Sequence, residues 1–236
     1  METPVDDLTF SRSLSALKQR GSNLLVVGSA AETVRKAAAR RFLGDGVGES
    51  RRRLFVFTDA AHTDTTIGSG PVTHGTTRVV TRETPTRGAA GVQQPSAATP
   101  TELPSSTQRE EIEHRTVDSE QLGTLAWAIE QELSGFERDG GPFATGELRL
   151  CFDSLTPLLS THDTPAVLRF LRAIGNRVRA DSGMAHYHLP VARDDPAVDE
   201  LAPLFDAVIE LRLSDGRPEH RWILRDESFE SDWLPL

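Results

Sequence analysis

Short apolar runs alternate with amphipathic helical segments between Leu24 and Leu213. The run Leu24-Leu25-Val26-Val27 is apolar at every position, which is typical of a parallel strand that is buried on both faces. Further strands are expected at residues 53–58, 78–81, 148–152 and 184–189. The alternation predicts an α/β fold, with a mainly parallel sheet and helices on both faces.

The last part of this pattern predicts a hairpin instead of another helical crossover. Residues 207–213 and 221–224 are both strand-like, and Ser214-Asp215-Gly216-Arg217 joins them. A turn of this composition is typical of a tight antiparallel connection. We therefore expect a C-terminal antiparallel hairpin at the edge of the parallel sheet.

Four helix starts can be recognised from their capping residues. Ser29 with Glu32, and Asp118 with Gln121, match the capping box, in which the first side chain binds a backbone amide three residues on. Thr164-Pro165 and Asp195-Pro196 each place a proline at the first helical position. Two of these helices carry clear apolar stripes, made of Leu122, Leu125, Ala126, Ile129 and Leu133, and of Val167, Phe170, Leu171, Ile174 and Val178.

Two segments have the composition of loops, residues 59–77 and 82–107. Both are rich in Thr, Ser, Gly, Pro and Ala, and the second contains four prolines and few large apolar residues. Such a segment cannot bury enough surface to offset the entropy lost on ordering. The chain is therefore predicted to be a single domain over residues 1–236, with a flexible insertion at about 82–107.

The charge balance restricts the possible partners and the setting. The formal net charge is −9, and Lys18 and Lys36 are the only lysines among 26 basic residues. An acidic surface disfavours phosphate contacts, so direct nucleic-acid binding is not expected. Acidic, lysine-poor sequences are typical of a high-salt cytoplasm; an arginine preference from a GC-rich genome is a compatible explanation.

The sequence also indicates where the protein is expected to reside. No apolar run approaches the length of a membrane span, and the first ten residues carry three acidic groups and no basic region. The single cysteine, Cys151, excludes an internal disulfide. We therefore expect a cytoplasmic protein that binds no membrane.

The junction at Gly28 has the strand–glycine–helix order of a phosphate-binding P-loop, GxxxxGK[ST]. The aligned residues depart from that pattern at Thr33, Val34 and Arg35, which replace the second glycine, the lysine and the magnesium-binding hydroxyl. Glu32 places a carboxylate where phosphate charge would lie. Arg35 and Lys36 are candidate substitutes for the lysine, but neither occupies its position. We expect Ser29 and Glu32 to cap the helix and no nucleotide to bind tightly.

A second candidate site follows the strand at residues 148–152. This apolar strand ends in Asp153 and Ser154, the Walker B arrangement in which a carboxylate orients magnesium. Without the P-loop lysine, Asp153 is expected to make hydrogen bonds at the strand end instead of catalysing a reaction. Ser154 and Thr156 are expected to hold the loop in the same way.

Three more residues are candidates for metal binding or cysteine catalysis. Alternation places His186 and His188 on one face of their strand, and with Asp153 they could bind zinc. No fourth ligand is identifiable, because Cys151 lies in the middle of a different strand between Leu150 and Phe152. A cysteine in that position is more often buried and inert. Neither a metal site nor a catalytic residue is predicted.

Three stretches of the chain resemble KaiC/RecA-type ATPases. Residues 21–28 (GSNLLVVG) look like the strand that leads into their ATP loop, and residues 151–159 (CFDSLTPLL) are similar to their Walker B strand. The run from Gly183 to Arg212 resembles a haloarchaeal set of KaiC-like proteins. The resemblance covers nearly the whole chain except residues 59–110. It implies a RecA-like P-loop NTPase fold with a degenerate Walker A motif, and a salt-adapted cytoplasm.

Fold and motifs together favour a regulatory or scaffold protein without catalytic activity, acting through a protein partner or self-association. No cofactor is expected. The alternative is a divergent ATPase that binds ATP with magnesium through Asp153, assisted by Arg35 or Lys36. A sensory or transcriptional accessory domain is a third class, but neither a helix-turn-helix signal nor a basic face supports direct DNA contact.

Overall fold

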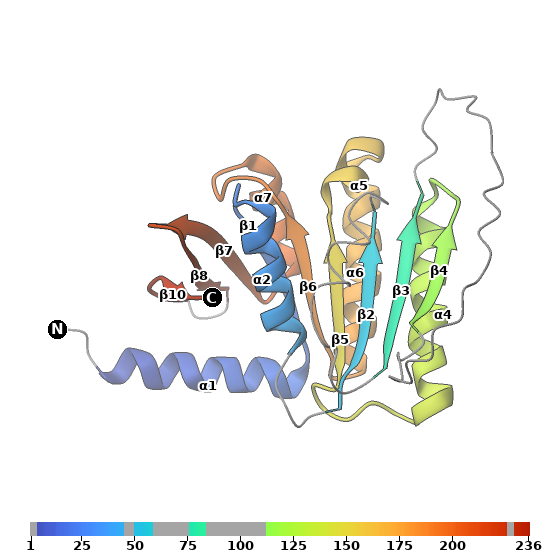
Figure 1. The fold of residues 1–236 in the computed structure, drawn as a ribbon, viewed down its shortest axis with the longest axis horizontal. Helices are drawn as coiled ribbons and strands as arrows, with labels where there is room; N and C mark the ends of the chain where they lie inside the picture. Colours follow the sequence, from blue (N-terminus) through green and yellow to red (C-terminus); the bar gives the residue numbers. More distant parts are fainter. Residues whose placement is uncertain (1–3, 45–49, 59–75, 84–111, 226–228) are drawn as a thin grey trace, which may run out of the picture.

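The described residues form a ten-stranded mixed sheet, in the strand order β10-β8-β7-β1-β6-β5-β2-β3-β4, with β9 also paired to β8 (Figure 1). The structure is a computed structural model that describes residues 4–44, 50–58, 76–83, 112–225 and 229–236. The sequence expectations for residues 59–75 and for most of the insertion at 82–107 fall outside these residues.

Seven neighbouring strands of the sheet are parallel, as the apolar runs predict. They are β1 (Ser22–Val27), β2 (Arg52–Phe57), β3 (Thr77–Arg82), β4 (Glu113–Val117), β5 (Leu148–Asp153), β6 (Met184–Leu189) and β7 (Ala207–Ser214). Strands β1 and β2 are buried along their whole length, which explains why they lack polar alternation. The α/β class and the mostly parallel sheet are thereby confirmed.

The C-terminal strands complete one side of the sheet in antiparallel fashion. Strand β7 pairs with β8 (Arg217–Leu224), which in turn pairs with the short β9 (Phe229–Glu230) and β10 (Leu234–Pro235). Asp215 and Gly216 form the hairpin turn with φ of 49° and 74°. Positive φ at both turn residues suits the twist of a two-residue hairpin. The predicted hairpin is confirmed, although β8 begins earlier than Arg221.

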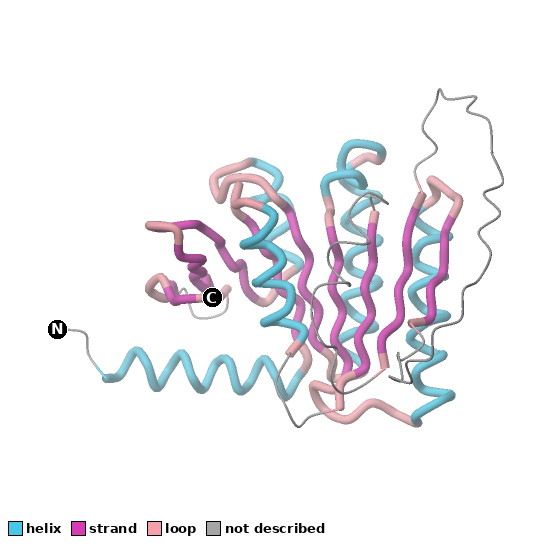
Figure 2. Tube along the Cα trace, viewed as in Figure 1, coloured by secondary structure: helices cyan, strands magenta, loops and turns pink. Residues whose placement is uncertain are grey.

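Helices flank the sheet on both faces (Figures 1 and 2). One face carries α1 (Pro4–Arg20) and α2 (Glu32–Leu43), whose Leu17, Val34 and Ala38 pack on β1, β7 and β8. The other face carries α4 (Leu122–Gly140), α5 (Thr156–Thr161), α6 (Thr164–Ala180) and α7 (Pro196–Leu201), followed by the 3₁₀ turn η2 (Ala202–Leu204). The larger apolar core lies on this second face.

Two helix starts are confirmed, and one capping box is wrong. The carboxylates of Asp163 and Asp195 accept hydrogen bonds from the first turns of α6 and α7, each of which has an early proline. The predicted box at Asp118 does not form, because α4 begins after Gln121 without a side-chain cap. Ser119 instead accepts a hydrogen bond from the Gln121 amide at 3.2 Å.

Strand β4 is absent from the sequence prediction because its residues, EHRTV, lack an apolar pattern. It pairs with β3 and ends the sheet, so most of its side chains are not buried. An edge strand of this kind needs few apolar residues. No helix in the described part of the chain is long and apolar enough to cross a membrane.

A buried ion pair joins β3 to α4. The Arg78 guanidinium lies 3.1 Å from the Glu132 carboxylate, and both side chains are about 5% exposed. Arg78 also stacks over the Phe136 ring at 4.8 Å, in the space left by Gly135, where a Cβ would meet the guanidinium. Glu132 receives a second contact from Arg115. The helix thus holds the outer strands through charge as well as apolar contact.

Neutralising Glu132 should destabilise the protein strongly. The substitution Glu132→Gln removes the buried carboxylate partner of Arg78, which keeps only the more exposed Glu113 and Asp139, and we expect a loss of about 2 kcal/mol in the free energy of unfolding. The matched control is Glu219→Gln, which breaks a more exposed pair with Arg212 at 2.7 Å and should cost less than about 1 kcal/mol. Equal losses in urea denaturation would contradict this assignment.

Candidate functional site

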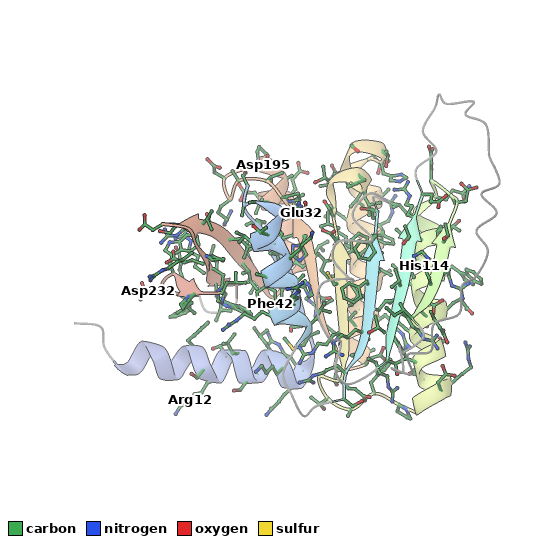
Figure 3. The ribbon with its side chains drawn as sticks, viewed as in Figure 1. Arg12, Glu32, Phe42, His114, Asp195 and Asp232 are labelled. Atoms are coloured by element: carbon green, nitrogen blue, oxygen red, sulfur yellow. The ribbon has the colours of Figure 1, made fainter. Side chains whose placement is uncertain are left out.

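The sequence-predicted residues meet at the carboxyl edge of three neighbouring strands, β1, β6 and β5. The start of α2 follows β1 at this edge, where Glu32 lies (Figure 3). A cavity there is lined by residues of α2, β5 and β6, namely Glu32, Arg35, Lys36, Ala39, Cys151, Asp153 and His188. The start of α2 and the end of β5, where the two candidate sites were expected, therefore line one cavity, although β6 lies between β1 and β5.

Gly28 is required for packing. Its φ is +127°, and a Cβ at this position would lie 2.3 Å from the Leu211 carbonyl oxygen of β7. Its amide donates to the Val191 carbonyl at 2.8 Å, so this group is already used in joining the loops after β1 and β6. The glycine permits a close approach between backbones, a role that only a residue without a side chain can fill here.

The predicted capping box at Ser29 and Glu32 is wrong. Helix α2 begins at Glu32, its N-cap is Ala31, and no side chain caps it. Ser29 and Thr33 are exposed, whereas Val34 is fully buried in the core. Glu32 instead forms an ion pair with Lys36 at 2.7 Å. The box fails because the loop continues for three residues beyond Gly28 before the helix starts.

The strand end at Asp153 and Ser154 is held mainly through the backbone. The Asp153 carbonyl accepts from the Thr58 amide at 3.1 Å, and the Ser154 carbonyl accepts from the Thr58 hydroxyl at 2.6 Å. The Ser154 hydroxyl accepts from the Thr156 amide at 3.2 Å, as expected from the sequence. The Asp153 side chain lines the cavity, close to Arg35 and Lys36.

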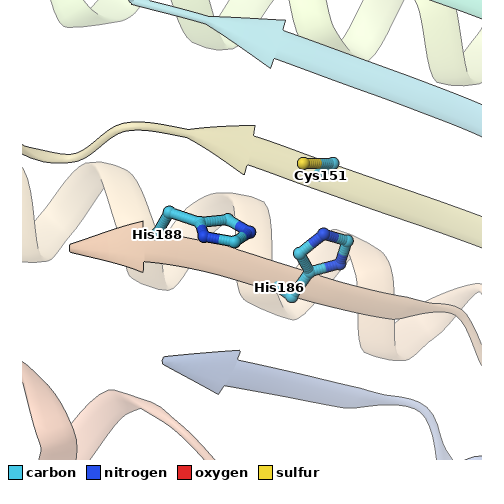
Figure 4. Close-up of side chains that lie close together, drawn as sticks. All are labelled: Cys151, His186 and His188. Atoms are coloured by element: carbon cyan, nitrogen blue, oxygen red, sulfur yellow. The ribbon is translucent and has the colours of Figure 1, made fainter. Parts of the chain in front are cut away.

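Below this edge the structure brings together three side chains that the sequence analysis did not connect. Cys151 on β5 and His186 and His188 on β6 have ligand atoms within 4.8 Å of one another, and all three are buried (Figure 4). They meet because β5 and β6 are neighbours in the sheet, with Cys151 opposite His186. The alternation in His-Tyr-His correctly placed both imidazoles on one face. The order of the strands, which the sequence does not reveal, places Cys151 beside the two histidines.

Burial determines the protonation of this cluster. It lowers the pKa of His188 to about 4, an effect opposed by Asp153 and increased by Arg35. Burial, helped by His188 and Arg149, also takes the pKa of His186 well below its usual value. Burial and the Asp153 charge raise the pKa of the Cys151 thiol well above its usual value. At neutral pH the cluster therefore contains two neutral imidazoles and a thiol.

Each neutral imidazole has a ring nitrogen without a hydrogen bond. The Nε2 atoms of His186 and His188 are buried without a hydrogen-bond partner in the described part of the chain. A buried polar atom left in this state costs about 1–3 kcal/mol. Phe42 of α2 covers His186 edge to face, with the ring centroids 5.7 Å apart, and so supplies packing but no acceptor.

Acid should destabilise the fold through its buried histidines. His220, packed near Phe42 and Trp222, has a pKa lowered to about 4 by burial and Arg41, so it shares the behaviour of His186 and His188. The unfolded chain binds these protons near pH 6.5, so stability present above pH 6.5 is lost as the pH falls toward 4. Asp181, whose burial raises its pKa to about 6, works in the opposite direction between pH 4 and 6.

We therefore expect the free energy of unfolding to be lower at pH 5 than at pH 7. The variant His220→Asn should remove about 1 kcal/mol of that difference, after allowance for solvent screening. Denaturation at the two pH values measures the effect. An unchanged difference in the variant would show that His220 is not buried in its neutral form.

Comparison with known proteins identifies a family but no activity. A search of curated proteins found no match. The model of a family of unknown function, DUF7504, matches residues 21–211. The match begins just before β1, ends within β7, and includes Gly28, Asp153 and all three residues of the Cys/His/His cluster. Since it spans most of the 236 residues, the protein belongs to the DUF7504 family of unknown function.

Proposed function

We propose that the protein is a RecA-like regulatory or scaffold protein without catalytic activity, which acts by binding another protein or a second copy of itself. The KaiC/RecA resemblance of residues 21–28 and 151–159 supports the RecA-like assignment. So does the sheet, because the parallel strands β1 and β5 end at the same edge with β6 between them. The acidic, lysine-poor composition and single cysteine support a salt-adapted cytoplasmic setting.

The geometry of the degenerate loop argues against nucleotide hydrolysis. The cavity beside Asp153 measures about 10 Å³, whereas pockets for nucleotide-sized ligands measure roughly 300–1,000 Å³. Val34, which stands where the P-loop lysine would be, is buried in the core and has no charge to offer a phosphate. Glu32 adds a negative charge beside the same space.

The observation that carries protein binding is an exposed tryptophan beside the edge strand β4. Trp127 of α4 is 58% exposed, and Ile112, which directly precedes β4, is 41% exposed. The Arg115 guanidinium of β4 lies 5.9 Å from the Trp127 ring centroid, so strand and tryptophan form one surface. Tryptophan and arginine are the residues most enriched at the centres of protein interfaces.

Strand β4 offers a way to bind a partner at this surface. It pairs with β3 on one side and with no described strand on the other. An open edge can accept a further strand through main-chain hydrogen bonds, while neighbouring side chains provide specificity. We accordingly place the partner's contact on β4 and Trp127, with a strand added to the edge and an apolar side chain over the indole.

Removing the tryptophan should weaken this association. Trp127→Ala is expected to lower the affinity for the partner, or for a second copy, by at least about tenfold. The matched control Leu213→Ala removes another exposed apolar side chain, 53% exposed, on the far side of the sheet and should have little effect. Light scattering and affinity capture with identified partners, both at molar salt, provide the measurement. If the wild-type chain neither self-associates nor retains a specific protein, the proposal fails.

The competing function is a divergent nucleotide-binding ATPase that uses Asp153. One observation favours it: Arg35, Lys36 and Asp153 line a common cavity, so cations and a carboxylate are close together. Arg35 lies on the helix just past the position of the lost lysine and is partly exposed.

Calorimetry with Mg-ATP at high salt separates the two functions. We expect no binding tighter than about 1 mM, because the space is too small and Glu32 repels phosphate. Asp153→Ala should then leave the titration unchanged. A micromolar dissociation constant that is lost in Asp153→Ala would contradict the non-catalytic proposal and establish the ATPase alternative.

A further inference from the structure

The parallel register of β5 and β6 places four potential ligands on one face of the sheet. Cys151 is opposite His186, and Asp153 is opposite His188. Residues two apart on a strand share a face, so all four side chains lie on the side covered by α2. Figure 4 shows Cys151 on its strand beside both imidazoles of the neighbouring strand.

The distances within this group are close to those of a coordination sphere. The ligand atoms of Cys151, His186 and His188 lie within 4.8 Å of one another. Ligands of a tetrahedral zinc ion, at about 2.3 Å for sulfur and 2.0–2.1 Å for nitrogen, are about 3.5 Å apart. Side-chain rotations that move these atoms by about 1 Å would therefore complete the sphere.

The chemistry of the group is unusual for a packed core. Cys151, His186 and His188 are each no more than 2% exposed, and the Nε2 atoms of both histidines are buried without a described partner. Buried polar atoms normally have hydrogen bonds, and an unsatisfied one requires an explanation such as an ion. Because burial keeps both imidazoles neutral, each has a lone pair available for coordination.

We propose that Cys151, His186 and His188 bind a thiophilic transition-metal ion, expected to be Zn²⁺. Zinc prefers sulfur and nitrogen ligands. Here two adjacent strands supply three of the four ligands of a tetrahedral site. On binding, the Cys151 thiol loses its proton to solvent and the thiolate sulfur bonds to the metal. This inference does not depend on the proposed function.

The small cavity above the cluster provides the fourth position. Cys151, His188 and Asp153 all contribute to its lining, and its volume of about 10 Å³ is close to that of one water probe. A water molecule or the Asp153 carboxylate therefore completes the four-coordinate sphere from this side. The thiolate and Asp153 together balance the two charges of the ion.

The charged groups around the cluster favour a metal ion that bonds directly to sulfur and nitrogen over one held only by carboxylates. Arg35 and Lys36 of α2 line the same cavity, and the Arg149 charge acts on His186 from β5. These cations oppose a second positive charge, whereas Glu32 partly neutralises Lys36 through their ion pair. A hard ion held only by carboxylates would not overcome this repulsion, but direct metal–sulfur and metal–nitrogen bonds can.

The first experiment uses the wild-type chain without a histidine tag. We expect elemental analysis to find one zinc per chain, or the metal-free protein to take up one zinc on titration. Substituting Co²⁺ should give a sulfur-to-cobalt charge-transfer absorption and the intense visible bands of tetrahedral cobalt. Absence of both the stoichiometric zinc and the charge-transfer band would overturn the proposal, without bearing on the protein-binding function.

The variants assign the ligands. Cys151→Ala should abolish the charge-transfer band, and His186→Asn or His188→Asn should weaken zinc binding by about 100-fold or more, beyond the losses typical of second-shell changes. Asp153→Asn should retain the band with a smaller loss in affinity. The matched control His220→Asn removes another buried histidine on the same face and should leave zinc binding unchanged.

Two outcomes would contradict the assignment. If His220→Asn weakens binding as much as His188→Asn, the losses reflect general destabilisation. If Cys151→Ala binds zinc as tightly as the wild type, the metal lies elsewhere. Stoichiometric copper with the same dependence on Cys151 would support the site but overturn the choice of zinc. Circular dichroism of each metal-free variant checks that the fold is retained.

Discussion

The register between β5 and β6 is the constraint on which the rest of the molecule depends. These strands lie in the interior of the sheet and pair in parallel from Arg149 with Met184 to Asp153 with His188. A shift by one residue would turn every side chain of a strand to the opposite face. The apolar side chains Leu150, Phe152 and Tyr187 fix the register, because they enter the large core beneath α4 and α6. Their alternates, Cys151 and the two histidines, are thereby directed to the other face.

The two faces of the sheet differ in how continuous their apolar cores are, and the polar candidate residues lie on the face with the less continuous core. The α4–α6 face buries a continuous apolar cluster that extends from Leu25 to Val208. On the α2 face the apolar residues form two smaller clusters, separated by the histidines, Arg149 and Asp153. A polar strip between two apolar clusters is costly in a protein interior unless each group has a partner. The protein retains this strip although an apolar one would pack with less cost.

The sequence predicts the fold more completely than the site, for a physical reason. Strands β1, β2 and β5 are recognisable because burial on both faces favours long apolar runs. Strand β4 was not predicted because an edge strand needs no such run, and the capping box at Ser29 fails because α2 begins only at Glu32. The Cys/His/His cluster depends on strand order. Cys151 and His186 are 35 residues apart, and nothing in either segment indicates that their strands are neighbours.

The loop after Gly28 and the buried cluster are connected through one helix, α2. Its Val34 points into the core, while Arg35, Lys36 and Ala39 face the cavity over Cys151 and His188. The helix therefore closes over the carboxyl ends of β5 and β6. The resulting space is too small for a nucleotide but comparable to a single water molecule or ion. The small size of this space and the enclosure of the Cys/His/His cluster thus follow from the same packing of α2 on β5 and β6.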